Sequence, residues 1–206
     1  MTPELAGWLH AAWAAARADL GWMTWNLALA AVPLALSVAL FRARTRRSPL
    51  WWAGVVAFIL FLPNGPYVLT DLIHLVDRVR VTESRSVIVL AVLPLYAAFL
   101  LAGVGAYAVS VLRLGRFLRR HGRPVLPFEI AIHALCALGV YLGRYTGVNS
   151  WDVVSRPETV AHALRSTLAS DQRLFVVAVT FLVITAVYAL LKTLTRAFPA
   201  SGLSTR

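Results

Sequence analysis

Long apolar runs alternate along the chain with short loops that carry most of the charge. Five of these runs approach or exceed the ~20 apolar residues that a helix needs to cross a bilayer. We expect spanning helices over about residues 23–41, 50–69, 86–112, 128–147 and 174–191. No internal repeat or low-complexity linker separates them. The pattern therefore predicts an all-α fold, a polytopic transmembrane helix bundle, with residues 1–206 as a single membrane domain.

Three further stretches are helix-forming but carry charges among their apolar residues. They cover residues 1–20, 71–81 and 156–168. Short amphipathic helices that lie on the bilayer surface fit this pattern. For residues 5–20 a sixth, poorer span is the alternative. The last stretch, residues 197–206, is predicted to be a flexible tail.

Composition supports a membrane protein. Apolar residues make up 59% of the chain, charged residues only 14%, and the mean hydropathy is +0.71. A soluble fold of this size could not cover that much apolar surface with so few polar residues. These values exclude a soluble enzyme, a disordered chain and a secreted disulfide scaffold.

The net charge of +11 is distributed unevenly between the loops. Arginines gather in residues 42–47 and 113–123, and Lys192, Arg196 and Arg206 follow the last span. The positive-inside rule makes this side cytoplasmic, with the N-terminus outside and the C-terminus inside. The arginine loops are predicted to contact anionic lipids of the bilayer rather than nucleic acid.

The second span ends in FLPNGPYVLTDLIHL, which contains two prolines. Pro63 and Pro66 disfavour helix at the residues before them, Leu62 and Gly65, so the span should stop or kink there. A helix that restarts after this break brings side chains at i, i+4 and i+7 close together. On it, Tyr67, Asp71 and His74 share one face, and Asn64 lies in the break itself.

The fourth span ends in LGRYTGVNSWD, which supplies Arg144, Asn149, Trp151 and Asp152. By the predicted topology, this segment, the break in the second span and Asn26 reach the same outer level of the membrane. Charged groups at that depth are costly and need a partner or a water-filled cavity. We therefore expect Arg144 to pair with Asp71 or Asp152.

These residues suggest an outward-facing polar pocket with three candidate catalytic groups: Asp71, His74 and Asp152. A histidine beside a carboxylate can transfer protons or bind a metal, although the sequence identifies no metal and no cofactor. The candidate substrate-binding residues are Asn64, Tyr67, Arg144, Asn149 and Trp151. Arg144 would hold an anionic headgroup. The alternative is an ordinary membrane interface of aromatic and polar residues without chemistry.

Glu129 and His133 lie one helical turn apart at the start of the fourth span. They predict either a second site on the cytoplasmic side or a structural hydrogen bond between the two side chains. The structural interpretation is favoured because a carboxylate suits a helix N-terminus.

The blocks WNLALAAVPL, FLPNGPYVLTDLIHL and LGRYTGVNSWD resemble, in this order, the family called domain of unknown function 1361 (DUF1361). The resemblance implies a multi-pass protein of the bacterial cytoplasmic (inner) membrane and no particular activity. The function expected from the residues is a membrane-embedded enzyme or binding protein for a lipid-linked or amphiphilic substrate. A small transporter, or a structural partner of other membrane proteins, remains as the alternative. The sequence does not fix the oligomeric state.

Overall fold

The computed structural model describes residues 2–42 and 47–197, and these residues are helical with no strand. Three short units differ from the α-helices: the 3-10 turn η1 and the π-helical turns η2 and η3. In chain order the elements are α1 (Pro3–Leu40), α2 (Pro49–Phe61), α3 (Asn64–Tyr67), η1 (Val68–Asp71), α4 (Leu72–Val81), α5 (Arg85–Val87), η2 (Ile88–Val92), α6 (Leu93–Arg120), α7 (Leu126–Tyr141), η3 (Leu142–Thr146), α8 (Asp152–Ser155), α9 (Pro157–Leu168) and α10 (Asp171–Ala197).

Five helical units of the described chain are long and apolar enough to cross a membrane. They are Pro3–Leu40, Pro49–Val81, Arg85–Arg120, Leu126–Thr146 and Asp171–Ala197. The predicted all-α fold with five spans is therefore confirmed, and the protein is an integral membrane protein. The units run beyond the predicted spans. Helix α1 begins already at Pro3, η1 and α4 continue the second unit to Val81, and α6 continues to Arg120.

Residues 1–20 do not form the separate surface helix, or the sixth span, that the sequence suggests. From Pro3 onward they are the first half of α1, which continues without a break to Leu40. Its 38 residues make a helix of roughly 57 Å at the usual rise. That length exceeds the ~30 Å hydrocarbon core. Only Gly21 lies at the expected boundary, and one glycine does not end a helix. The predicted tail lies outside the described residues, except for Ala197, which ends α10.

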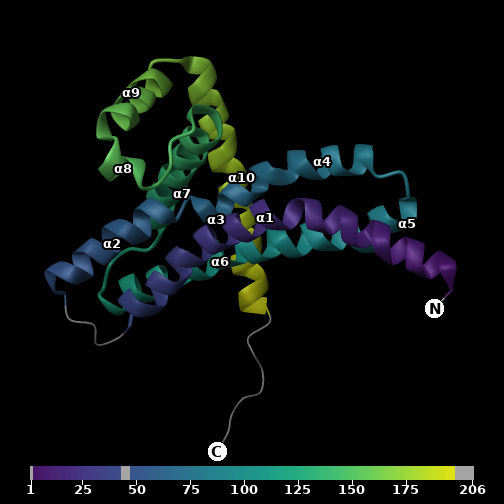
Figure 1. Ribbon diagram of the computed structural model, residues 1–206. Helices are drawn as coiled ribbons and strands as arrows, with labels where there is room; N and C mark the ends of the chain where they lie inside the picture. The colour runs from purple at the N-terminus through teal and green to yellow at the C-terminus, as the bar shows by residue number, and fades with distance from the viewer. Residues whose placement is uncertain (1, 43–46, 198–206) are drawn as a thin grey trace, which may run out of the picture.

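Helix α1 packs along α6, and α4 runs beside this pair, as Figure 1 shows. Helix α10 crosses the bundle and packs mainly on α7. The short unit of α3 and η1 lies against α6 and α7, and glycines make this close approach possible. A Cβ on Gly65 would lie 2.7 Å from Tyr107 Cβ, and one on Gly139 would lie 2.7 Å from Pro63 Cγ. The break in the second span is thereby held inside the bundle.

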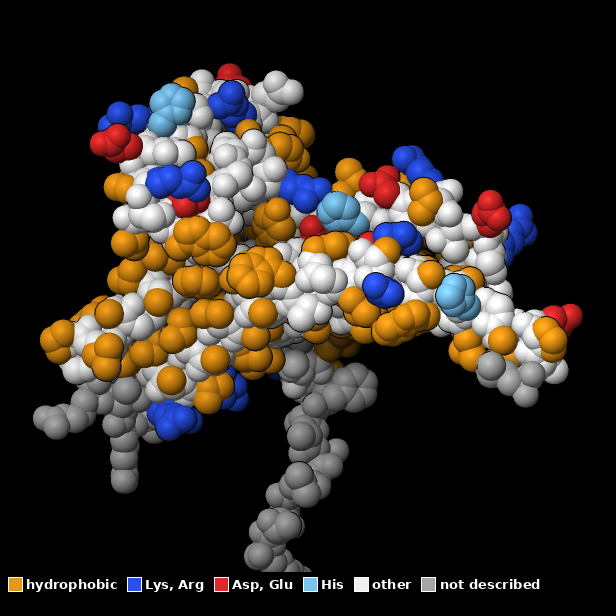
Figure 2. Space-filling view, in the orientation of Figure 1, with side chains coloured by type: hydrophobic (Ala, Val, Ile, Leu, Met, Phe, Trp, Pro, Cys, Tyr) orange, Lys and Arg blue, Asp and Glu red, His pale blue; other side chains and the backbone are white. Residues whose placement is uncertain are grey.

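The surface of the protein divides into apolar and charged regions. Figure 2 shows apolar side chains gathered over α2 and the adjoining half of α1, with charged side chains over α4, α8 and α9. Large apolar side chains stay exposed, among them Leu50 at 81% and Leu101 at 68%. Because lipid tails are as apolar as leucine, such exposure suits helices that face the bilayer.

Candidate functional site

The site begins at the break between α2 and α3, where two prolines remove backbone donors. Gly65 N–H turns to the Leu62 carbonyl at 3.2 Å, so the Phe61 carbonyl loses its usual partner. The Asn64 side chain replaces that partner, donating from Nδ2 to Phe61 O at 2.8 Å. The expected interruption is present because α2 ends at Phe61, although Leu62 itself keeps helical angles (φ −58°, ψ −35°). Burial of Leu62 and the replacement hydrogen bond keep the chain helical, so the break is a tight kink.

Asp71 is the most deeply buried of the predicted site residues apart from Asp152, with 2% of its surface exposed. Three side chains from three parts of the chain surround its carboxylate. Asn26 on α1 donates to Oδ2 at 2.9 Å. Arg144 Nη1 lies 3.7 Å from Oδ1, and His74 Nε2 lies 3.9 Å from the same oxygen. Arg144 thus forms an ion pair with Asp71, as expected, but at 3.7 Å the guanidinium lies beyond hydrogen-bonding distance.

The π-helical turn η3 positions Arg144 at the end of α7. Such turns widen a helix by one residue and occur frequently at functional sites. Here the turn ends at Gly147, which has a left-handed conformation with φ 68°. A glycine adopts that angle without strain, and the chain then reverses into the segment from Asn149 to Asp152.

Asp152 organises the reversal that follows η3. Its Oδ2 accepts the Asn149 backbone N–H at 2.7 Å, and its Oδ1 accepts two bonds from Arg156, at 3.0 and 2.9 Å. The hydrogen bond from Asn149 and the nearby Arg156 guanidinium lower the pKa of the Asp152 carboxyl below its usual value. Both carboxylate oxygens are thus used within one local turn.

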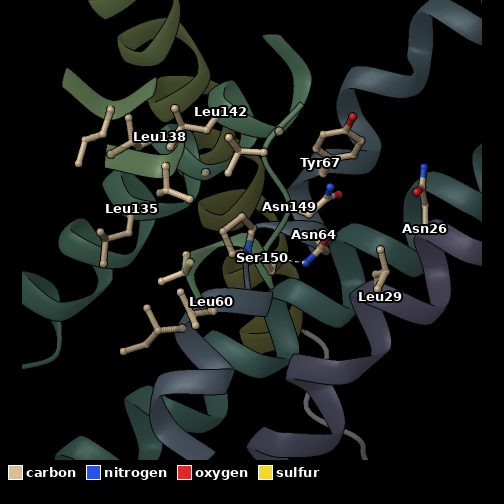
Figure 3. A pocket seen from close by; sticks show the side chains of 18 of the residues that line it. Asn26, Leu29, Leu60, Asn64, Tyr67, Leu135, Leu138, Leu142, Asn149 and Ser150 are labelled. Atoms are coloured by element: carbon tan, nitrogen blue, oxygen red, sulfur yellow. Dashed lines mark hydrogen bonds between the residues drawn. The ribbon is translucent and has the colours of Figure 1, made fainter. Parts of the chain in front are cut away.

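Next to this turn lies a pocket of about 370 Å³ between α1, the α2–α3 break, α7 and α9. Figure 3 shows two kinds of lining. The side chains of Asn26, Asn64, Tyr67, Asn149 and Ser150 make one end polar. On the other side Figure 3 shows the apolar side chains of Leu60, Leu135, Leu138 and Leu142. Val153, Val160 and Leu164 also line the pocket, and Leu29 lies beside Asn26. The pocket therefore combines a small polar end with a longer apolar wall.

The predicted site residues separate into two groups in space. Asn64, Tyr67 and Asn149 line the pocket, and Asn64 Nδ2 joins the two sequence blocks by donating to Ser150 Oγ at 3.2 Å. Asp71, His74, Arg144, Trp151 and Asp152 do not line it. The first three form the charged cluster beside Asn26, and Trp151 is 42% exposed.

The arrangement does not assemble a metal centre from the described residues, since no three His, Cys, Asp or Glu side chains converge. The three candidate catalytic residues, Asp71, His74 and Asp152, therefore do not form a group that could hold a metal ion. The local hydrogen bonds of Asp152 with Asn149 and Arg156 account for its position instead.

A further buried carboxylate, Asp19, was not identified from the sequence as a site residue. It is 5% exposed and accepts two hydrogen bonds from Arg78, at 2.8 and 2.7 Å. Tyr96 and Trp22 add further donors, at 3.0 and 3.3 Å. The indole of Trp22 also packs against the His74 ring, with 4.8 Å between centroids. Asp19, Trp22, Arg78 and Tyr96 thus form a cluster that connects α1, α4 and α6 next to the charged cluster of Asp71.

At the other end of α7, the predicted hydrogen bond between Glu129 and His133 is absent among the described residues. Glu129 instead accepts from Lys192 at 2.7 Å and from Tyr188 at 2.6 Å, both on α10. His133 Nδ1 pairs with the Tyr107 hydroxyl at 2.5 Å. The longer reach of Lys192 and Tyr188 across the α7–α10 interface explains the difference.

A comparison of the sequence with protein families gives one match. The model of the family described as a protein of unknown function (DUF1361) covers residues 25–186. No curated protein and no solved structure matches the chain.

Proposed function

This chain belongs to the DUF1361 family, and we propose from its site that it binds an amphiphilic molecule in the pocket between α1, α2, α7 and α9. The observation that carries the proposal is the division of the pocket into a polar end and an apolar wall. Ligand sites of this kind are mostly apolar, with a few polar groups that fix orientation. A volume of about 370 Å³ lies within their usual range.

The apolar wall is continuous with the surface that would face lipid. Ile59 and Leu135 line the pocket and are also 39% and 50% exposed. An amphiphile in the bilayer can therefore enter sideways, with its chain along α2 and α7 and its headgroup toward Asn64 and Asn149. No lipid tail has to pass through water on this route, which avoids the cost of exposing apolar surface.

We further propose that the pocket faces the outer leaflet of a bacterial cytoplasmic membrane. The arginines after α1 and α6, together with Lys192 and Arg196 near the end of α10, lie at the helix ends opposite to the pocket turn of residues 147–152. The positive-inside rule assigns such arginines to the cytoplasm, where anionic headgroups attract them. Arg44, Arg46 and Arg206 fall outside the described residues.

Binding is better supported than catalysis. Asp71 is held by Asn26 and Arg144, and Asp152 is held by its own turn, so neither carboxylate faces the pocket. A general base must reach the proton that it removes. Catalysis by Asp71, His74 or Asp152 stays a prediction, as do the transporter and structural-partner alternatives.

Copurifying lipid tests the proposal. Leu135→Trp fills the apolar wall of the pocket, whereas Leu182→Trp places the same side chain on α10, at a residue that is 63% exposed and outside the pocket. After purification, we expect mass spectrometry to find one enriched class of amphiphile in the unchanged protein and in Leu182→Trp. Leu135→Trp should lose it. The same lipid profile in all three proteins would overturn the proposal.

A further inference from the structure

The side-chain amides at the polar end of the pocket are oriented in a way that indicates the chemistry of the ligand's headgroup. This inference rests on the proposed function, the binding of an amphiphile. Asn26 Nδ2 donates to the Asp71 carboxylate, and Asn64 Nδ2 donates to the Phe61 carbonyl. Both partners can only accept hydrogen bonds, so each must face the NH₂ group of the amide. Asn149 Nδ2 likewise lies 3.5 Å from the Gly147 carbonyl and from Asp152 Oδ2.

The protein therefore uses the donors of these amides and leaves their acceptors free. The second N–H of Asn64 Nδ2 donates to Ser150 Oγ. The Oδ1 atoms of Asn26, Asn64 and Asn149 accept no hydrogen bond from any described residue. All three residues line the polar end of one pocket, from α1, α3 and the turn after η3 (Figure 3). A ligand at this end meets carbonyl oxygens, which accept hydrogen bonds.

The charge of the pocket lining restricts which kind of headgroup can supply these hydrogen-bond donors. None of the residues that line the pocket is ionisable except Tyr67. The neighbouring carboxylates are neutralised, since Asp71 pairs with Arg144 and Asp152 with Arg156. A phosphate or carboxylate headgroup would meet carbonyl oxygens, and none of the lining residues is an Arg or Lys that could pair with an anion. An ammonium group would find no unpaired carboxylate.

From these contacts we infer that the pocket binds an amphiphile whose headgroup is uncharged and rich in hydroxyl groups, such as a glycosyl or polyol lipid. The expected role of Arg144 as the ligand of an anionic headgroup is replaced by its role as the counter-ion of Asp71. The hydroxyls of Tyr67 and Ser150 complement such a headgroup because each can donate or accept.

The test compares lipids that differ in their headgroup. The delipidated protein is kept in an amine-oxide detergent, which has no sugar to compete. Monoglucosyl diacylglycerol and phosphatidic acid of matched acyl chains are then added, and bound lipid is measured by native mass spectrometry. We expect the glucosyl lipid to bind and the phosphatidic acid to bind at least tenfold more weakly.

Variants connect the binding to the amides. Asn149→Ala removes one free carbonyl and only two hydrogen bonds of 3.5 Å, while the backbone bond to Asp152 remains. Loss of one hydrogen bond should weaken glucosyl-lipid binding by about fivefold. Gln172→Ala removes an exposed amide outside the pocket and should bind like the unchanged protein. If Asn149→Ala binds the glucosyl lipid as tightly as Gln172→Ala does, the inference fails.

The lipid preferences also separate this inference from the proposed function. A preference for phosphatidic acid that is lost in Leu135→Trp would overturn the uncharged headgroup and leave amphiphile binding intact. Binding of neither lipid, together with no copurifying amphiphile, would overturn both.

Discussion

Asp71 lies on η1 and Arg144 on η3, yet the guanidinium is 3.7 Å from the carboxylate, with the two side chains 3% and 27% exposed. Asn26 on α1 holds the second carboxylate oxygen. Three segments that are distant in the sequence thus meet at one buried charge. This cluster lies directly beside the polar end of the pocket because Asn26 belongs to both. Its integrity should therefore determine the shape of the pocket.

The first prediction concerns Asp71→Asn, which is nearly isosteric but removes the charge. Arg144 then loses its counter-ion, and breaking a buried pair on one side costs about 3 kcal/mol. We expect a lower midpoint of thermal unfolding in detergent. The double change Asp71→Asn with Arg144→Gln should recover part of the loss. If the double variant is less stable than the single one, the pair is not what stabilises this junction.

The second prediction tests the Asp19 cluster, where four donors meet one carboxylate. Asp19→Asn leaves Arg78 without its bidentate partner, and we expect a loss of about 3 kcal/mol in stability. Asp77→Asn is the matched control. Asp77 is 62% exposed and 3.8 Å from Arg80, so its loss should cost less than about 1 kcal/mol. Chemical unfolding followed by tryptophan fluorescence measures both, and equal losses would contradict the assigned role of Asp19.

The third prediction uses two glycines in helices. A Cβ on Gly139 would lie 2.7 and 2.9 Å from ring atoms of Pro63, whereas one on Gly105 would meet nothing within 4 Å. Gly139→Ala should destabilise the protein by about 1–3 kcal/mol through overpacking. Gly105→Ala should stabilise it slightly, because alanine is the better helix former. Thermal unfolding of the two variants should shift in opposite directions.

The sequence predicted the membrane helices well because apolar length is a local property. Five spans follow from five apolar runs, and the kink at Pro63 and Pro66 follows from proline chemistry. The end of a helix is less predictable when nothing in the sequence breaks it. The charges in residues 4–20 predicted a surface helix. In the structure Asp19 accepts hydrogen bonds from Arg78 and Tyr96, and it is therefore buried within α1.

The site was predictable as a set of segments but not as a set of contacts. The expected meeting of the Asn64, Asp71 and Arg144 segments is present, and so is the Arg144–Asp71 pair. Which polar groups face the pocket depends on hydrogen bonds made by their other atoms, and these bonds need coordinates. The Asp19–Arg78 pair joins two charges 59 residues apart. The sequence indicated only that Asp19 and Arg78 each lie in a helix-forming stretch that carries charges among apolar residues.

The fourth prediction concerns acid. The pKa of Asp152 is lowered in the folded protein, chiefly by the Asn149 N–H and then by Arg156. The stabilisation from this carboxylate is therefore fully present above its unfolded pKa of ~3.9. It is lost as the pH falls through the lower folded value. We expect the unchanged protein to unfold at a higher temperature than Asp152→Asn near neutral pH, with the difference shrinking below about pH 4. A difference that does not depend on pH would contradict this account of the turn.

The fifth prediction concerns orientation, on which the proposed access from the outer leaflet depends. The only cysteine, Cys136, is 1% exposed and should not react with a membrane-impermeant maleimide. Glu158→Cys introduces an exposed thiol on α9, near the pocket, and His121→Cys introduces one just after α6, among the arginines. If arginines remain cytoplasmic, intact cells should label Glu158→Cys, and His121→Cys should label only after the cells are permeabilised. The reverse pattern would place the pocket at the cytoplasmic leaflet, and the amphiphile would then have to be supplied from inside the cell.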